Sequence, residues 1–169
     1  MSTSDHFAML GLPVGYDIDR AALEQSYLSL SQQHHPDRAV GGTSSEQRAA
    51  VEKSAALNEG YRVLRDPVRR AEYLCKLGGV DLDSNEGAPK MDQAFLMEMI
   101  ERREQLQEAR TGAALDALRE DVGGELDVAL DEAIAGLRAD EIDAAARALV
   151  RRRYLQRLVD EIDARAEAM

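Results

Sequence analysis

Tryptophan is absent from this chain of 169 residues, and the other aromatic residues make up only 4% of it. Cysteine occurs once, as Cys75, which excludes an internal disulfide and offers no set of thiolates for a metal. No apolar run is long enough for a transmembrane helix, and no basic segment followed by an apolar block predicts a secretory signal. These absences predict a protein of the reducing cytoplasm.

Positive charge is also scarce, because 21 basic side chains stand against 32 acidic ones and leave a net charge of −11. Residues 1–80 carry nine basic and ten acidic side chains, whereas residues 81–169 carry twelve and twenty-two. A strongly acidic half argues against nucleic acid or an anionic membrane as the main partner. We therefore expect neither among the partners, and we expect two units with different tasks.

The apolar residues that are present predict an all-α fold, because they are mostly Leu, Ala, Val and Met and no segment has a convincing strand pattern. From Asp19, a good N-cap, apolar residues recur at intervals of three or four until Pro36 ends the helix. A loop over residues 41–45 follows, and Ser45 is placed to cap a second long helix. The short loop predicts an antiparallel hairpin that turns at residues 35–45.

The rest of the chain predicts a second group of helices. We expect helices over residues 5–10, 67–77, 92–109, 113–137 and from 140 to near the end. Asp140 is a plausible N-cap, and Gly123-Gly124 predicts a kink. The pattern indicates an N-terminal domain over 1–77, a linker over 78–91 and a three-helix antiparallel bundle over 92–169.

At the turn of the hairpin stands His34-His35-Pro36-Asp37-Arg38, of which we call residues 35–38 the tip motif. Pro36 restricts the backbone, so its neighbours hold nearly constant positions. A metal site of His34, His35 and Asp37 is disfavoured, because residues so close in sequence cannot easily surround an ion. From these residues alone, a working contact and a plain helix-ending turn both stay open.

The surrounding residues resemble the J-domain of DnaJ-type co-chaperones over residues 5–77. Beyond the tip motif, the resemblance rests on Leu57-Asn58, Tyr61, Leu64, Asp66-Pro67, Arg70 and Tyr73. It implies that the tip motif docks on a DnaK-class ATPase chaperone, accelerates ATP hydrolysis there and does no chemistry itself. The chaperone-binding residues would be His35, Pro36, Asp37 and Arg38, with Arg20 as a further base.

Nearly the whole chain resembles HscB, the J-protein dedicated to iron–sulfur cluster assembly. The matching segments are Asp5-His6-Phe7, Leu10-Gly11-Leu12-Pro13, Arg70-Ala71-Glu72-Tyr73-Leu74 and Phe95-Leu96-Met97-Glu98. The resemblance implies an HscA-class partner, an IscU-type scaffold protein as cargo, and no cofactor. General J-domains line the helix before the tip with bases, but this chain has none between Arg20 and His34. A general J-protein that serves DnaK is the alternative.

The segment from Asp92 predicts a second working surface. On a helical projection Phe95, Met99 and Leu106 share one stripe, whereas Leu96, Met97 and Ile100 fall on a separate arc. That arc is either a wide core stripe or an exposed protein-binding patch. The resemblance favours the patch and implies scaffold binding by Leu96, Met97, Ile100, Glu101, Arg103, Glu104 and Tyr154.

The remaining polar residues are interpreted as structural. Arg151-Arg152-Arg153 most simply neutralises an acidic bundle, with a partner contact as the alternative. Cys75 is expected to be a small buried hydrophobe, and His6 has no partner that the sequence reveals. Besides a general J-protein, a metalloenzyme and a purely structural helical protein remain as rival interpretations.

Overall fold

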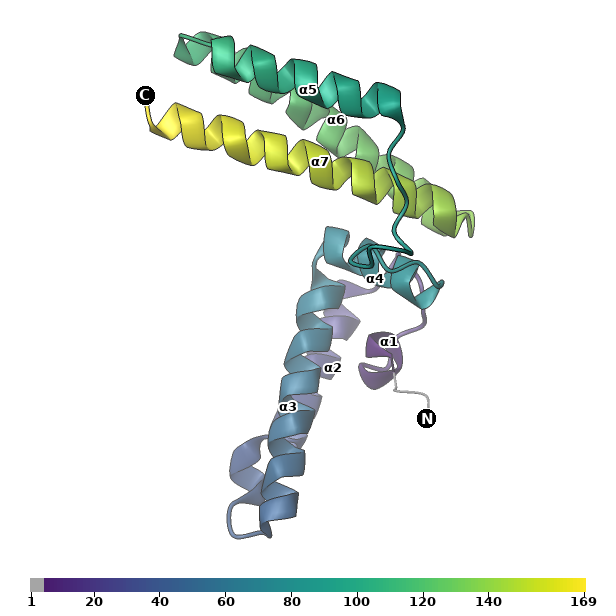
Figure 1. The fold of residues 1–169 in the computed structure, drawn as a ribbon. Coiled ribbons are helices and arrows are strands. Elements are labelled where there is room, and N and C mark those ends of the chain that lie inside the picture. Colours follow the sequence, from purple (N-terminus) through teal and green to yellow (C-terminus); the bar gives the residue numbers. More distant parts are fainter. Residues whose placement is uncertain (1–4) are drawn as a thin grey trace. The chain divides into compact units, whose positions relative to one another are not determined.

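The computed structural model describes residues 5–169, and over this range every regular element is a helix, which confirms the all-α prediction. The elements are α1 (His6–Met9), α2 (Arg20–Gln33), the 3₁₀ helix η1 (Pro36–Ala39), α3 (Ser44–Arg65), α4 (Pro67–Leu77), α5 (Gln93–Glu108), α6 (Gly112–Arg138) and α7 (Ile142–Glu167) (Figure 1). None of the helices in this range has both the length and the apolar character that a membrane span requires. The chain forms two compact units, which divide between Tyr73 and Leu74.

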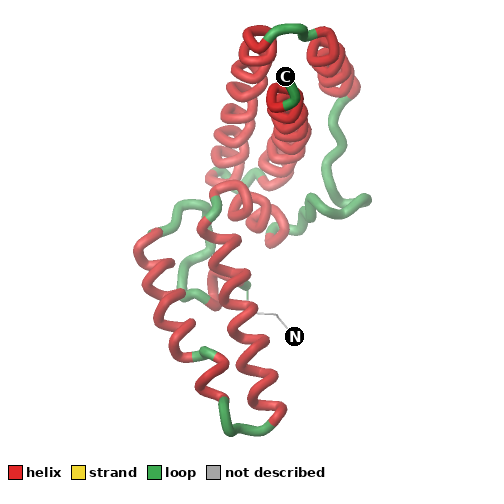
Figure 2. The backbone as a smooth tube through the Cα atoms, turned by 90° about the vertical axis from the view of Figure 1, so that its left-hand side faces the viewer, coloured by secondary structure: helices red, strands yellow, loops and turns green. Residues whose placement is uncertain are grey.

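The first unit contains the predicted helical hairpin, in which α2 and α3 lie side by side and run in opposite directions (Figures 1 and 2). Asp19 caps α2 as predicted, because its carboxylate accepts a hydrogen bond of 3.1 Å from the Ala22 amide. The cap of α3 is Thr43 and not Ser45. Thr43 Oγ1 accepts from the Glu46 amide, and the Glu46 carboxylate accepts from the Thr43 amide, so the two residues form a capping box.

The hairpin is closed at its base by α1 and by Tyr73. Phe7 is fully buried, and the His6 ring stacks on Tyr73 with 4.4 Å between ring centroids, which supplies the partner that the sequence did not reveal. Gly60 lies inside α3 where α1 packs against it. A Cβ at Gly60 would come within 2.8 Å of Met9 Cε, so the glycine permits this close approach.

The second unit is the predicted bundle of α5, α6 and α7. Its core contains Met99, Leu106, Leu115, Leu118, Val122, Ala129, Leu155, Leu158, Val159 and Ile162. The helix α6 continues through Gly123-Gly124 without interruption. Near the end of α6, Gly136 lies so close to α7 that a Cβ there would be 3.1 Å from the Ala145 backbone nitrogen. Small residues at this point bring the two helices together.

The prediction that Asp140 caps the last helix is wrong. Asp140 instead ends α6 in the left-handed region, with φ of 58°. The Glu141 amide donates to the Gly136 carbonyl and the Asp140 amide donates to the Leu137 carbonyl, which is the Schellman arrangement. The same pair of bonds ends α1 at Gly11 and α4 at Gly79, where glycine takes the positive φ.

Asp140→Gly is therefore expected to raise the free energy of unfolding by about 0.5–1 kcal/mol, because glycine adopts positive φ without steric cost. Urea unfolding followed by circular dichroism measures the change. Ala135→Gly is the matched control, because it places glycine on the exposed face of the same helix at helical φ. It should lower stability by about 1 kcal/mol. Equal effects of the two substitutions would contradict the assignment of strain to Asp140.

Candidate functional site

The tip motif is organised by η1, which begins immediately after α2 ends. His35 is the N-cap of this short helix, and its Nδ1 accepts a hydrogen bond of 3.2 Å from the Asp37 amide. Pro36 occupies the first helical position, where a missing amide hydrogen costs nothing. The Asp37 side chain is 88% exposed, and one of its oxygens lies 3.5 Å from His35 Nδ1. The motif therefore presents a carboxylate at a fixed place on the surface.

The same hydrogen bond indicates the tautomer of the neutral imidazole. Because Nδ1 of His35 accepts the bond from the Asp37 amide, the proton of the neutral ring is on Nε2. In this tautomer the ring holds the Asp37 backbone in place. Within residues 5–169 no group of three His, Cys, Asp or Glu side chains could hold a metal ion.

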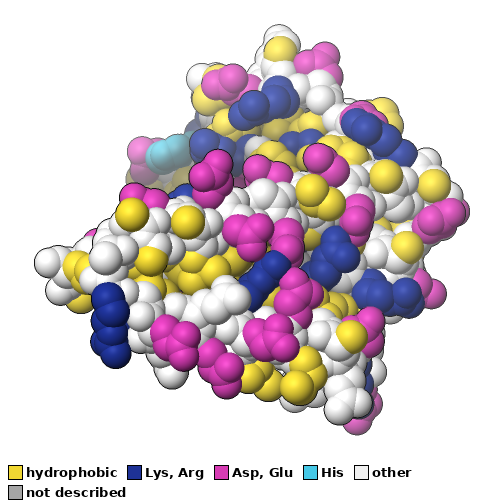
Figure 3. Space-filling view, turned by 90° about the horizontal axis from the view of Figure 1, so that it is seen from above, with side chains coloured by type: hydrophobic (Ala, Val, Ile, Leu, Met, Phe, Trp, Pro, Cys, Tyr) yellow, Lys and Arg dark blue, Asp and Glu magenta, His cyan; other side chains and the backbone are white. Residues whose placement is uncertain are grey.

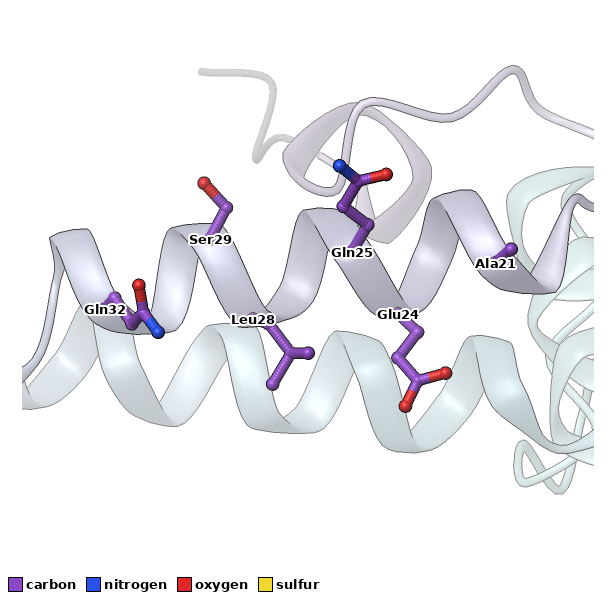
Figure 4. Close-up of a pocket in the computed structure, with 6 residues that line it drawn as sticks. All are labelled: Ala21, Glu24, Gln25, Leu28, Ser29 and Gln32. Carbon is purple, nitrogen blue, oxygen red and sulfur yellow. The ribbon is translucent and has the colours of Figure 1, made fainter.

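Arg20 does not lie beside the tip motif. It occupies the first position of α2, and the tip follows the last position, so about 20 Å of helix separates them. Figure 4 shows the outer face of α2 between them. A shallow depression of about 430 Å³ on this face is lined by Ala21, Glu24, Gln25, Leu28, Ser29 and Gln32. Leu28 is 53% exposed there, and no lining residue is basic.

The helix α5 has the two faces that the sequence predicted. Met99 and Leu106 are buried with 3% and 7% exposure. On the other face Leu96, Met97 and Ile100 are 37%, 51% and 50% exposed, and we call these three residues the α5 patch. The interpretation of a wide core stripe is therefore wrong. Figure 3, which looks down on the bundle, shows hydrophobic side chains interspersed with acidic and basic ones.

Tyr154 lies between the core and the surface. Its ring packs edge-on against Phe95 at 5.8 Å between centroids, and Arg157 lies over the ring at 5.8 Å from the centroid. The structure shows this side chain half-buried, because Phe95 brings it against the core cluster. These two contacts hold the aromatic ring in a defined orientation.

The charged residues around the α5 patch are accessible. Glu101 and Glu104 are exposed, and Arg103 pairs loosely with Glu161 at 3.4 Å. In the arginine run, Arg151 pairs with Glu132 and Arg153 lies 3.0 Å from the Asp83 carboxylate. These pairs support the interpretation that the run neutralises acidic groups, Glu132 in the bundle and Asp83 in the segment before it.

Sequence analysis missed the buried cation that fixes α5. Arg102 is 8% exposed and lies among three carboxylates, those of Glu98, Asp121 and Glu125. Two bonds to Glu125 connect α5 to α6. Hydrogen bonding to Arg102 holds the pKa of Glu125 below its ordinary value, although partial burial opposes the shift. The i, i+4 spacing of Glu98 and Arg102 was the only local signal of this cluster.

Glu125→Gln is expected to lower the free energy of unfolding at pH 7 by about 1 kcal/mol, a modest value because solvent screens the half-exposed carboxylate. The pKa of Glu125 is lower in the folded chain than in the unfolded chain. Its charged form therefore stabilises the fold above the ordinary pKa of 4.5, and this contribution is lost as the pH falls through the folded-state pKa.

The measurement is urea unfolding by circular dichroism at pH 7 and at steps between pH 5 and pH 3. The variant should lose less stability over the acid steps than the wild type. Glu120→Gln, at an exposed position of the same helix, should leave the pH profile unchanged. A Glu125→Gln profile as steep as that of the wild type would show that this carboxylate is not linked to folding.

Two family models match the chain in succession. The DnaJ domain matches residues 5–73, and the HSCB C-terminal oligomerisation domain matches residues 91–163. A co-chaperone protein HscB homolog of Bordetella petrii is 45% identical over 138 residues, which cover 82% of this chain and 76% of that relative. The chain belongs to the HscB co-chaperone family. An HscB homolog of Cupriavidus taiwanensis is 48% identical over 114 residues, which cover 68% of this chain and 64% of that relative.

Solved structures of HscB proteins share the fold. Chaperone HscB from Vibrio cholerae is 29% identical, with a TM-score of 0.79 over 97% of this chain and 98% of its own. Human co-chaperone protein HscB is 25% identical, with a TM-score of 0.84 over 100% of this chain and 85% of its own. The predicted family and fold class are therefore confirmed.

Membership of the HscB family makes this chain a J-domain co-chaperone of iron–sulfur cluster assembly. HscB co-chaperones regulate the ATPase of a chaperone and are not enzymes themselves. The tip motif and the α5 patch are therefore candidate contacts with other proteins. The exposed Asp37 and the α5 patch lie in different compact units, so each unit carries one candidate contact.

Proposed function

We propose that the chain stimulates the ATPase of an HscA/DnaK-class chaperone through its tip motif and delivers an IscU-type iron–sulfur scaffold protein to that chaperone. The observation that carries the proposal is the pair of surfaces in one HscB-family chain. One surface is a rigid, exposed His-Pro-Asp turn. The other is the α5 patch, whose apolar side chains are exposed although other residues of α5 already supply its contacts with the core.

The proposed chaperone contact uses His35, Pro36, Asp37 and Arg38, with Arg20 as a separate basic contact at the far end of α2. The cap on η1 means that Asp37 needs little further ordering when it binds, which reduces the entropic cost of association. A carboxylate offers only acceptors, so the complementary surface must supply donors. ATP hydrolysis takes place on the chaperone, and the tip motif contributes no catalytic group.

The proposed scaffold contact uses the α5 patch with Glu101, Arg103, Glu104 and Tyr154. Three apolar side chains with an aromatic ring beside them form the kind of centre that dominates binding energy at protein interfaces. The surrounding charges contribute specificity and association rate more than affinity. The bundle itself is held together by its own core, so the exposed side chains remain available for a partner.

The residues on the outer face of α2 are the basis for the proposed class of chaperone. This face has a carboxylate, amides and Leu28, and it has no base between Arg20 and His34. Such a face does not complement a strongly acidic chaperone surface, and this favours a dedicated HscA-class partner over a general DnaK. We further propose a J-domain over 1–77, a linker over 78–91 and a scaffold-binding bundle over 92–169, acting in a bacterial cytoplasm.

Single-turnover ATP hydrolysis tests the function. The full chain is added to an HscA-class and to a DnaK-class chaperone, each with and without an IscU-type scaffold. The largest stimulation is expected with HscA, the chain and the scaffold together. Equal stimulation of DnaK, without any dependence on the scaffold, would support the general J-protein instead.

A further inference from the structure

A groove of about 500 Å³ lies within the second unit, directly beside the proposed scaffold contact. One wall is the irregular segment 82–91, and the other is formed by α5 and α7. Leu96 and Tyr154 line the groove and also belong to the proposed contact. The α5 patch therefore continues around Tyr154 into a recess. We call this recess the Tyr154 groove.

The segment 82–91 is attached to α7 by an arginine. The Arg153 guanidinium donates to the Leu82 carbonyl at 3.2 Å and to the Asp83 carboxylate at 3.0 Å. Leu82 is itself 8% exposed, so the start of the segment is anchored by an apolar side chain as well. The wall of the groove is thus tied to the helix that carries Tyr154. A recess with fixed walls is suited to receive a partner segment.

Three of the residues that line the groove are basic, namely Lys90, Arg153 and Arg157, and one, Asp83, is acidic. Arg157 is exposed and lies over the Tyr154 ring, yet no carboxylate within residues 5–169 forms an ion pair with it. Arg153 is paired with Asp83, whereas Lys90, like Arg157, forms no ion pair within residues 5–169. The Arg157 guanidinium, which stacks on the Tyr154 ring, can therefore donate hydrogen bonds to a ligand.

We propose that the Tyr154 groove binds an extended segment of the scaffold protein in which an acidic side chain follows or precedes an apolar one. The carboxylate pairs with Arg157, and the apolar side chain contacts Leu96 and Tyr154. The inference rests on the function proposed above and adds the chemistry of the partner. Charge complementarity and continuity with the α5 patch select this occupant, and a recess of this volume takes a few side chains rather than a folded domain.

Titration calorimetry of the full chain with an IscU-type scaffold tests the groove. Arg157→Glu is expected to weaken binding at least tenfold, and Arg157→Gln severalfold. The affinity of the wild type should fall with added salt more steeply than that of Arg157→Gln. Arg147→Glu is the matched control, because it makes the same charge change at an exposed position of α7 outside the groove. It should change the affinity less than twofold.

The outcomes separate this inference from the proposed function. If Arg157→Glu binds like the wild type while Leu96→Ala/Ile100→Ala binds poorly, the groove inference is wrong and the scaffold contact stands. If neither variant weakens binding, both are wrong. If Arg157→Glu alters only the self-association of the chain in sedimentation, the occupant is a second copy and the inference is overturned. Recovery of Arg157→Glu binding by one acidic-to-lysine change in the scaffold would identify the paired carboxylate.

Discussion

Asp37→Ala is expected to abolish stimulation of the partner ATPase, with at least a tenfold loss in the single-turnover rate enhancement, while the chain stays folded. The Asp37 side chain is 88% exposed, and one of its carboxylate oxygens lies 3.5 Å from His35 Nδ1. Removal of such a side chain should change the free energy of unfolding by about 0.5 kcal/mol or less. The loss of ATPase stimulation would then come from the missing contact between Asp37 and the chaperone, because the fold of the variant is unchanged.

The control for this variant is Glu52→Ala, which removes an exposed carboxylate from α3 in the same unit. Its stimulation should equal that of the wild type, and both variants should unfold at the same urea concentration as the wild type. Asp37→Ala should still bind the scaffold with unchanged affinity, because the α5 patch lies in the other unit. Stimulation by Asp37→Ala at the wild-type level would remove the proposed role of the tip motif.

Leu96→Ala/Ile100→Ala is expected to weaken scaffold binding by about a hundredfold, since truncation of two central apolar side chains at an interface costs on the order of 3 kcal/mol. Both side chains are exposed in the chain itself, at 37% and 50%, so stability should change little. Titration calorimetry measures the affinity, and urea unfolding measures the stability. The double variant should still stimulate the chaperone in the absence of scaffold.

Val128→Ala serves as the control for the double variant, because it removes a similar exposed apolar side chain from α6. Its affinity for the scaffold should remain within twofold of the wild type. If the double variant binds as tightly as the wild type, the α5 patch is not the scaffold contact, and the cargo must bind elsewhere.

Much of the fold could be predicted because its signals are local. Apolar periodicity located the hairpin and the two faces of α5, and the Asp19 cap follows from residues within one turn of the helix. The cap of α3 was predicted wrongly although its signal is also local. Thr43 and Ser45 are both hydroxyl residues near the helix start. Glu46 follows Thr43 by three residues and completes a capping box, whereas Arg48 stands at the same distance from Ser45.

The features that sequence did not predict depend on contacts between distant residues. Tyr154 is half-buried because Phe95, 59 positions earlier in the chain, packs against it. Arg102 is buried because Glu125 approaches from a neighbouring helix. Asp140 adopts a positive φ because α6 and α7 must approach closely at Gly136 and Ala145, a constraint that outweighs the preference of aspartate for helix starts. Periodicity along one segment has no information on such contacts.

The division of the chain into two compact units affects the effective concentration at which the chaperone and the scaffold meet. With the chaperone bound to one unit and the scaffold to the other, the two proteins form a single particle. Their encounter is then first-order and no longer depends on how dilute each protein is. Pairs that are tethered by a short connection experience an effective concentration on the order of millimolar. On the proposed function, a weak direct affinity between chaperone and scaffold therefore suffices, because the covalent chain through Tyr73 and Leu74 supplies the proximity.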